Sequence, residues 1–441
     1  MTESVVLTGG LAVTSLSPPA VVSADVVIAE GRIASVGEST DGGTRIDCAG
    51  CLVIPGNVCA HHHLYSSLAR GMPYRLQPPM NFVDILRRIW WRLDCALDAR
   101  MISASAAVGG AEALLAGTTT VVDHHASPNA VEGSLDLVAD ALETVGVRSI
   151  LCYEVSDRDG PATAEAGIDE NRRFLKEVRP MSRGMVGAHA SFTLSEETLA
   201  ACVELARTEG VGLHVHVAED EADQRDAIAR FGRPVAVRLA DEGAVDERSV
   251  LAHCIHLSDD ERGAIRDAGA TAVHNPRSNM NNRVGHAAVR SFDRLALGTD
   301  GIDGDLFAEG RAAFWRAREA DPSIEPGWVL GRLAESARGA GRAFGEPLLG
   351  RIEAGAPADV VVLDYDPPTP VDDETLAGHW VFGISAARVR DVVVDGRVAV
   401  RERTLTTADH AEIAQDGRRH ALRLWQRMDE MGEHPFEPQG A

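Results

Sequence analysis

Through the middle of the chain, apolar runs of strand length alternate with longer amphipathic segments. Strands are predicted where such a run ends in polar residues, at 118–123, 185–189, 212–217, 250–253, 271–275 and 295–300. Helices are predicted between them, at 99–115, 135–145, 169–178, 196–209, 233–241 and 259–268. In one of these, Leu199, Val203 and Ala206 form a stripe at helical spacing. Repeated strand–helix units predict a parallel sheet, and this many units favour an α/β fold closed into a (β/α)8 TIM-type barrel.

The two ends of the chain have a different pattern, with short β-branched strands. Glu30-Gly31 separates two apolar runs and predicts a hairpin, as does Asp395-Gly396 between the runs at 389–394 and 397–400. We therefore expect residues 1–54 and 356–405 to form one small β-sandwich domain. The barrel would occupy residues 55–355, and residues 406–441 would form a C-terminal helix and tail.

The composition restricts the partners of the protein. The 441-residue chain has a formal net charge of −23, which disfavours nucleic acid, because phosphate binding needs a basic surface. The seven scattered cysteines suggest reduced thiols and a cytoplasmic location. No basic leader and no apolar run of about 18 residues is present, so neither a signal peptide nor a membrane span is expected.

A run of three histidines, His61-His62-His63, follows the first apolar strand of the central region. Side chains alternate sides along a strand, so His61 and His63 should face one way and His62 the other. Such a pair can offer two imidazole nitrogens to one metal ion, at the usual Zn–N distance of about 2.0–2.1 Å. By itself the histidine pair is only weak evidence for a metal site.

Other predicted strands also end in groups suited to metal chemistry. His214 and His216 share one face of a strand, Glu219 follows three residues later, the next strand ends at His253, and the last ends at Asp300. Strand ends meet at the C-terminal face of a parallel barrel, where active sites lie. Each residue also has an ordinary interpretation, as a half-buried histidine bonded to backbone or as a turn residue.

Taken together, the series predicts a metal-dependent hydrolase. His61 and His63, a third histidine from the pair His214 and His216, and Asp300 can hold one divalent ion and leave a position for water, whose pKa then falls toward about 7. Glu219, His253 and Asp300 are the predicted catalytic groups: His253 and Asp300 stabilise and transfer protons, and Glu219 acts on the leaving nitrogen.

This order of residues resembles the amidohydrolase superfamily, in the aminohydrolase branch that contains guanine and cytosine deaminases and triazine hydrolases. The resemblance implies a barrel with a β-sandwich made from both chain ends, and one zinc or iron ion per chain. It also implies that His61 and His63 are the first metal pair, His216 the third ligand, Glu219 the proton shuttle, His253 the polarising histidine, and Asp300 a ligand and base.

A narrower likeness runs over nearly the whole chain. The segments Asp123-His-His-Ala-Ser-Pro128, Arg277-Ser-Asn-Met-Asn-Asn282 and Leu297-Gly-Thr-Asp-Gly-Ile302 resemble the SsnA-type aminohydrolases. The function of that subgroup is poorly defined, so the likeness narrows the fold more than the substrate. The family leans to homodimers or larger, with the Trp90-Trp91 segment and the C-terminal helix as candidate interface pieces.

Residues near the predicted metal site are candidates for substrate contact, with structural roles as the alternative. They are Tyr65, Arg70, His125, His189, Asn275, Ser278 and Asn279. Trp90 and Trp91 could stack on a planar ring, but burial is the stronger expectation. Among 43 basic residues the single lysine is Lys176, predicted in a helix, which argues against a lysine-bridged binuclear site.

We therefore expect a mononuclear enzyme that removes an exocyclic amine, as ammonia, from a nitrogen heterocycle resembling guanine, 8-oxoguanine or a pterin. The first alternative is hydrolysis of a cyclic amide or a carbon–halogen bond. The second is a metal-binding protein that has lost catalysis, which the presence of Glu219 and His253 disfavours. Small heterocycles and water are the expected reactants.

Overall fold

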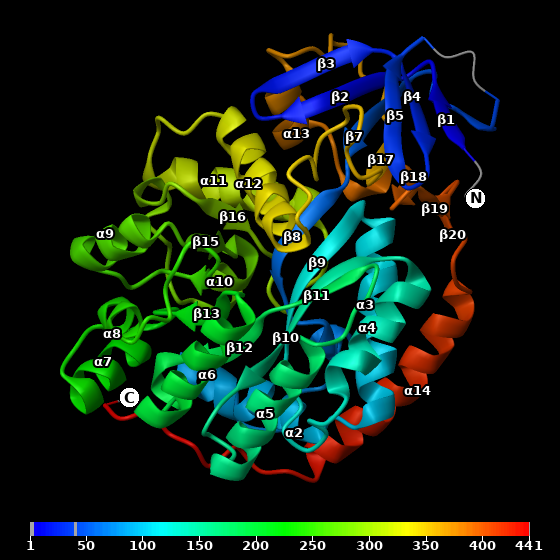
Figure 1. Cartoon of the computed structure of the whole chain (residues 1–441). Coiled ribbons are helices and arrows are strands. Elements are labelled where there is room, and N and C mark those ends of the chain that lie inside the picture. Colours follow the sequence, from blue (N-terminus) through cyan, green and yellow to red (C-terminus); the bar gives the residue numbers. More distant parts are fainter. Residues whose placement is uncertain (1–3, 39–41, 441) are drawn as a thin grey trace.

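A barrel of parallel strands forms the centre of the computed structural model, which describes residues 4–38 and 42–440 (Figure 1). Neighbouring strands follow one another around the barrel, and the bridge between His62 and Asp300 joins the first to the last. The strands are β8 (Asn57–His62), β9 (Thr118–His125), β10 (Arg148–Val155), β12 (Val186–Ala190), β13 (Leu213–Val217), β14 (Val250–His253), β15 (Thr271–His274) and β16 (Leu295–Leu297), with β11 (Ser182–Gly184) beside β10. The predicted barrel is confirmed.

Helices cover the outside of the barrel, as the sequence pattern predicts. They are α1 (Phe82–Ile85), α2 (Trp91–Ala96), α3 (Ala99–Leu115), α4 (Ser134–Val145), α5 (Pro161–Phe174), α6 (Glu196–Glu209), α7 (Glu221–Phe231), α8 (Val235–Asp241), α9 (Asp259–Ala268), α10 (Pro276–Asn282), α11 (Leu306–Ala320) and α12 (Gly327–Phe344). The predicted bounds of α3, α6 and α9 are confirmed. For α5 they are wrong, because the helix begins at Pro161, whose fixed φ suits a first turn, and ends four residues early.

The terminal segments form two sheets that pack against each other at one side of the barrel (Figure 1). One contains β5 (Arg32–Gly37), β4 (Asp25–Ala29), β1 (Val5–Thr8) and β6 (Thr44–Asp47), in that order. The other contains β20 (Thr404–Leu405), β19 (Arg397–Arg401), β18 (Val389–Val394), β17 (Val360–Asp364), β7 (Cys51–Pro55), β2 (Leu11–Leu16) and β3 (Pro19–Ser23).

Strands from both chain ends meet in the second of these sheets, because β7 pairs antiparallel with β17. Buried residues of the two sheets, such as Ile28 and Val53, share one core. Both predicted hairpins are confirmed, as β4–β5 and β18–β19. The division of the chain after residues 54, 355 and 405 stays a prediction, and residues 1–3, 39–41 and 441 lie outside the described part.

The C-terminal segment passes over the end of the barrel where the strands finish. Helices α13 (Leu376–Phe382) and α14 (His410–Asp429) precede it, and α14 packs along α3. The tail then runs from α2 to α7 (Figure 1). The backbone N–H of His434 donates to Arg87 O at 2.9 Å, and the backbone N–H of Gln439 donates to Asp226 Oδ1 at 2.7 Å. Within residues 4–38 and 42–440, no helix is long and apolar enough to cross a bilayer.

Candidate metal centre

Two histidines of the triple run reach one site, although the strand is not regular there. The pairing of β8 with β9 shifts register between Cys59 and His62, and His63 lies just beyond the last residue of the strand. The atoms of His61, His63 and Asp300 that could bind a metal lie within 4.8 Å of one another. Among the described residues, His62 belongs to no such group. The predicted pairing of positions 61 and 63 therefore has a structural basis.

The tautomers of two histidines are set by backbone carbonyls. The Nδ1 atoms of His63 and His216 lie 2.7 Å from the carbonyl oxygens of His124 and His189 and donate to them. Each Nε2 therefore presents a lone pair, and these two atoms face each other at 3.1 Å. Two opposed lone pairs repel unless a cation lies between them. Hydrogen bonds through the other ring nitrogen are also typical of metal-ligating histidines.

His61 and Asp300 complete this cluster. Asp300 Oδ1 lies 3.2 Å from His63 Nε2 and 3.7 Å from His61 Nε2, and the latter nitrogen is buried without a hydrogen-bond partner. Ser278 Oγ donates to Asp300 Oδ2 at 2.5 Å, which orients the carboxylate. Three imidazoles and one carboxylate are a donor set that suits zinc, so these residues fit a single divalent ion.

Burial keeps these imidazoles in the neutral form that ligands require. It lowers the pKa of His61 and His216 well below the usual value and also lowers the pKa of His63. Burial alone would raise the pKa of Asp300, but the nearby His63 and His253 and the hydroxyl of Ser278 lower it. The resulting set of neutral imidazoles and one carboxylate is ready to bind a cation.

A second pair of groups lies beside Asp300. Glu219 Oε2 is 3.3 Å from His253 Nε2, which lies 3.9 Å from Asp300 Oδ2. His253 Nδ1 lies 2.8 Å from Asn279 Oδ1 and donates to it, and Asn282 Nδ2 donates to Glu219 Oε1 at 3.3 Å. Burial raises the pKa of Glu219 to about 7, which lets this carboxyl group gain and lose a proton near neutral pH.

The backbone is strained at the ends of the strands that carry these groups. Ala218, His253 and Asp300 adopt φ values of 45°, 72° and 54°. Side chains with a Cβ rarely occupy this region, and such strain concentrates at functional sites. The strained backbone therefore marks this end of the barrel as the functional site, independently of which residue types lie there.

A cavity of about 40 Å³ adjoins the cluster. It is bounded by His63, Tyr65, Trp90, His189 and Glu219, among others. Trp90 packs on the backbone after Asp300: a Cβ at Gly301 would lie 2.2 Å from the indole, so only glycine fits there. Trp91 is buried and packs against His434 and Phe436 of the tail. The expected burial is confirmed for Trp91, whereas Trp90 is only half-buried and lines the cavity.

The structure gives the predicted substrate contacts different positions. Tyr65 and His189 line the cavity. Ser278 and Asn279 instead hold Asp300 and His253, and Asn275 Nδ2 lies 3.5 Å from His253 Nδ1.

Two of the predicted contacts lie away from the cavity wall. His125 is buried and bonds Ser127 Oγ at 3.0 Å. Arg70 is not brought to the cluster, because its side chain is 57% exposed and forms a two-pronged ion pair with Glu112. The 3-10 helix Leu64–Ala69 turns the chain away from the metal pair before this position. Proximity in sequence to the metal pair was therefore misleading for Arg70.

Sequence reasoning missed a buried network of charged groups at the other wall. Glu154, at the end of β10, accepts from Arg158 Nη1 at 2.7 Å and lies 3.0 Å from His124 Nδ1. Arg158 also pairs with Asp94 at 2.6 Å, and Asp94 and Glu154 both line the cavity. The sequence did contain a signal for this network. The run at 149–153 ends in a glutamate, just as the strands recognised from the sequence end in polar residues.

Comparison with known proteins identifies the class that this barrel and site define. The sequence model of the Amidohydrolase family matches residues 52–399. The chain is 30% identical over 424 residues to a 5'-deoxyadenosine deaminase of Methanosarcina mazei, covering 92% of this chain and 94% of that protein. It is 31% identical over 422 residues to a 5-methylthioadenosine/S-adenosylhomocysteine deaminase of Desulforudis audaxviator, covering 91% and 94%. The chain belongs to the amidohydrolase family.

Solved structures share the fold over almost the whole chain. A zinc-bound adenosine deaminase from Xanthomonas campestris has a TM-score of 0.83 at 22% identity, with 96% of this chain and 98% of that chain covered. The zinc complex of an atrazine chlorohydrolase from Arthrobacter aurescens has a TM-score of 0.81 at 24% identity, with 95% and 100% covered. Family membership and the ligand cluster together make this protein a metal-dependent hydrolase of carbon–nitrogen bonds, an aminohydrolase.

Proposed function

We propose that His61, His63, His216 and Asp300 hold one zinc ion per chain, with iron as the alternative, and that the enzyme deaminates a nitrogen heterocycle. The opposed Nε2 atoms of His63 and His216, 3.1 Å apart, carry this proposal, because both rings donate through Nδ1 and keep their lone pairs for a cation. When bound, such an ion lowers the pKa of water toward about 7 and so supplies a nucleophile at neutral pH.

The chain's own residues then move the protons. Asp300 Oδ2, held by Ser278, accepts a proton from the attacking water. Glu219 donates a proton to the ring nitrogen next to the carbon under attack, and a pKa of about 7 suits this exchange. His253, fixed by Asn279 through Nδ1–H, acts as an imidazolium with both nitrogens protonated, a form that the adjacent carboxylate of Asp300 stabilises, and it donates from Nε2 to the developing oxygen. The amine takes the proton that Asp300 received from the water and leaves as ammonia, while Glu219 takes the proton of the new hydroxyl as the carbonyl forms, so both carboxyl groups return to their starting forms.

A planar ring resembling guanine, 8-oxoguanine or a pterin is the first substrate candidate. The cavity has room for about 40 Å³, far less than the roughly 150 Å³ that holds a benzene ring, so side chains around it must move to admit a ring. Its walls include Tyr65, Trp90 and the buried acids Asp94 and Glu154. Aromatic walls suit a flat ring, and buried carboxylates suit the N–H edge of a guanine-like ring.

An adenine nucleoside is the second candidate, and the relatives favour it. Proteins about 30% identical over more than nine-tenths of the chain are named as deaminases of 5'-deoxyadenosine, 5-methylthioadenosine and S-adenosylhomocysteine. A nucleoside needs room for its sugar beyond the ring. Side chains of α1 and α2 that line the cavity, such as Phe82 and Trp91, would have to move further for a nucleoside than for a free base.

An ammonia-release assay on free bases and matched nucleosides separates these candidates. The panel compares the free bases guanine, 8-oxoguanine and a 2-aminopterin with the nucleosides guanosine, adenosine and 5'-deoxyadenosine. In parallel, chloride release is measured on chlorinated triazines, and ring-opened acid is measured on cyclic amides. Release from a free base supports the first candidate, and release only from adenosine derivatives supports the second. Chloride or acid without ammonia would contradict the deaminase proposal.

Two broader proposals accompany this function. Cytoplasmic location is supported by seven buried cysteines, all of them free thiols. A homodimer is supported by Leu422 on α14, which is 66% exposed on the outer face of that helix. Light scattering on the purified chain tests the dimer directly.

A further inference from the structure

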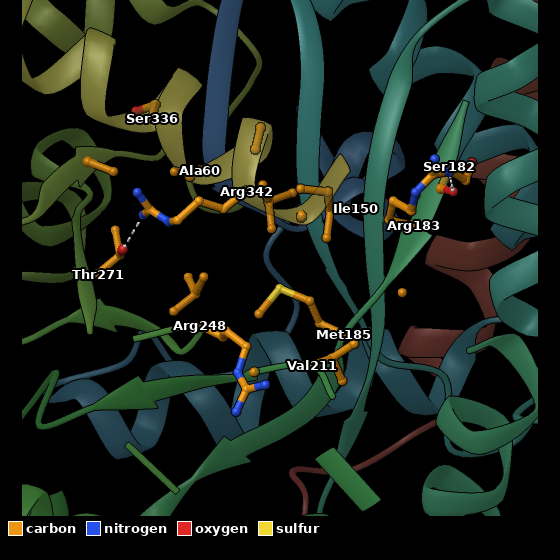
Figure 2. A pocket seen from close by; sticks show the side chains of 18 of the residues that line it. Ala60, Ile150, Ser182, Arg183, Met185, Val211, Arg248, Thr271, Ser336 and Arg342 are labelled. Carbon is orange, nitrogen blue, oxygen red and sulfur yellow. Dashed lines mark hydrogen bonds between the residues drawn. The ribbon is translucent and has the colours of Figure 1, made fainter. Parts of the chain in front are cut away.

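A second and larger cavity opens at the opposite end of the barrel, where the strands begin (Figure 2). Its volume is about 270 Å³, and it shares no residue with the cavity beside the metal ligands. Its walls come from the starts of β13, β14 and β15, from the inner faces of β8, β9, β10 and β16, and from α12. A parallel barrel is normally filled by side chains at this level, so the space requires an explanation.

Small side chains at inward positions leave this space. Ala60 of β8 and Ala296 of β16 stand where larger branched residues usually fill a barrel. Val122, Ile150 and Val273 complete an apolar wall with them, and this wall forms the deep part of the cavity. An engineered apolar cavity of about 150 Å³ binds benzene, so a cavity of 270 Å³ can hold a longer apolar body.

Arginines gather at the mouth of the cavity, with glutamates among them: the lining includes Arg179, Arg183, Arg248 and Arg342 as well as Glu177, Glu247 and Glu335. Arg183, Arg248 and Arg342 lie on different sides of the opening in Figure 2. Arg342 Nη2 donates to Thr271 Oγ1 at 3.0 Å and to Glu335 at 3.3 Å. Arg248 pairs with Asp246 at 2.9 Å.

Arg183 differs from the other two arginines. Its Nη1 donates only to the carbonyls of Arg179 and Ser182, both at 2.8 Å, and its guanidinium lies 4.7 Å from the ring centroid of Phe344. Within residues 4–38 and 42–440, no carboxylate forms an ion pair with it. Glu346 lies near enough to interact electrostatically with Arg183, but its carboxylate pairs with Arg32, so the guanidinium of Arg183 remains available to an anion.

We propose that this cavity binds a small amphipathic anion, with its apolar body against Ala60, Ile150 and Ala296 and its carboxylate or phosphate head at Arg183 and Arg342. The site is independent of the deaminase proposal, because no metal ligand lines it. The ligand is therefore an additional molecule, distinct from the substrate.

Calorimetric titration of the whole protein with octanoate and octyl phosphate tests the proposal. We expect one site per chain with a dissociation constant of about 1 mM or tighter for at least one of them, and the better head identifies the natural anion. Octan-1-ol and octylammonium, which have the same chain, should bind at least about tenfold more weakly, because they lack the negative charge.

Two variants locate the site. Val250→Phe places a ring in the cavity and should abolish binding, and Arg183→Met should weaken it about fivefold while keeping the apolar stem. Arg207→Met on α6, an exposed arginine with a single surface partner, is the matched control and should bind as wild type. Asp300→Asn should also bind the anions normally, which would show that they do not bind at the metal end of the barrel.

The outcome does not depend on one variant folding, because thermal melting of each protein is recorded first. If Val250→Phe melts early, the Arg183→Met and octylammonium comparisons still decide. Three outcomes would each overturn the proposal. They are equal binding of octanoate and octylammonium, unchanged binding in Arg183→Met, and no heat with either anion at a concentration 10 times the expected dissociation constant.

Discussion

The two ends of the barrel are built from the same strands but differ in chemistry. On β14, Val250 faces the apolar cavity at one end and His253 faces Glu219 at the other, only three residues later. The strand ends carry strained backbone and two buried imidazole nitrogens, His61 Nε2 and His253 Nε2, that have no hydrogen-bond partner. The strand starts carry apolar walls and arginines. Chemistry therefore concentrates where the strands end, and changes at the opposite end should affect stability or ligand binding but not turnover.

The largest expected effect is at Asp300. Asp300 is proposed both to bind the metal and to accept the proton, so Asp300→Asn removes both functions and turnover should fall by at least about 10⁴-fold. Ammonia release on the best substrate measures turnover, and elemental analysis of the same sample measures bound metal. A variant with turnover near wild type would contradict the assignment of Asp300.

Glu219→Gln should come next, with a loss of about 10²–10⁴-fold. The amide keeps the shape and the hydrogen bond from Asn282, but it cannot carry the proton. Metal content should stay at the wild-type level, because Glu219 is assigned no ligand role. A variant that loses its metal would show instead that Glu219 is a ligand.

Asn279→Ala tests positioning at the same end. Without the bond to Nδ1, the ring of His253 can rotate or change tautomer, so kcat should fall about 10–100-fold with little change in KM. Asn279→Asp, which restores an acceptor for Nδ1, should recover part of the loss. Equal effects of both variants on KM and kcat would indicate a substrate contact instead.

The smallest effect on turnover is expected at the opposite end. Phe344→Ala removes a buried ring that packs beside Arg183 and Arg148, and should lower the free energy of unfolding by about 3 kcal/mol. At temperatures where the variant is folded, kcat/KM should stay within about twofold of wild type. Denaturant unfolding and the ammonia assay measure the two quantities, and a large fall in kcat/KM would break the contrast between the ends.

Much of the fold was predictable because strand and helix periods are local properties of the sequence. His61, His63, His216 and Asp300 were recognisable because each ends an apolar run or lies beside its end. Helix α7 was missed because few of its residues are apolar and no clear stripe marks it.

Other features depend on three-dimensional placement. Arg70 follows the metal pair closely in sequence, but the 3-10 helix between them directs it to Glu112. The bonds from Ser278 to Asp300 and from Asn279 to His253 depend on how α10 packs against the strand ends. The second cavity exists because the small side chains of Ala60 and Ala296 leave space inside the barrel. No pattern of residues along the sequence reveals that space.

The most direct test of the account is a zinc titration of the chelator-treated enzyme, with ammonia release and bound metal measured on each sample. One ion held by His61, His63, His216 and Asp300 predicts no turnover without metal, and a rise in proportion to bound zinc that ends at about one ion per chain. Full turnover in the metal-free protein, or a rise that continues to two ions per chain, would contradict it.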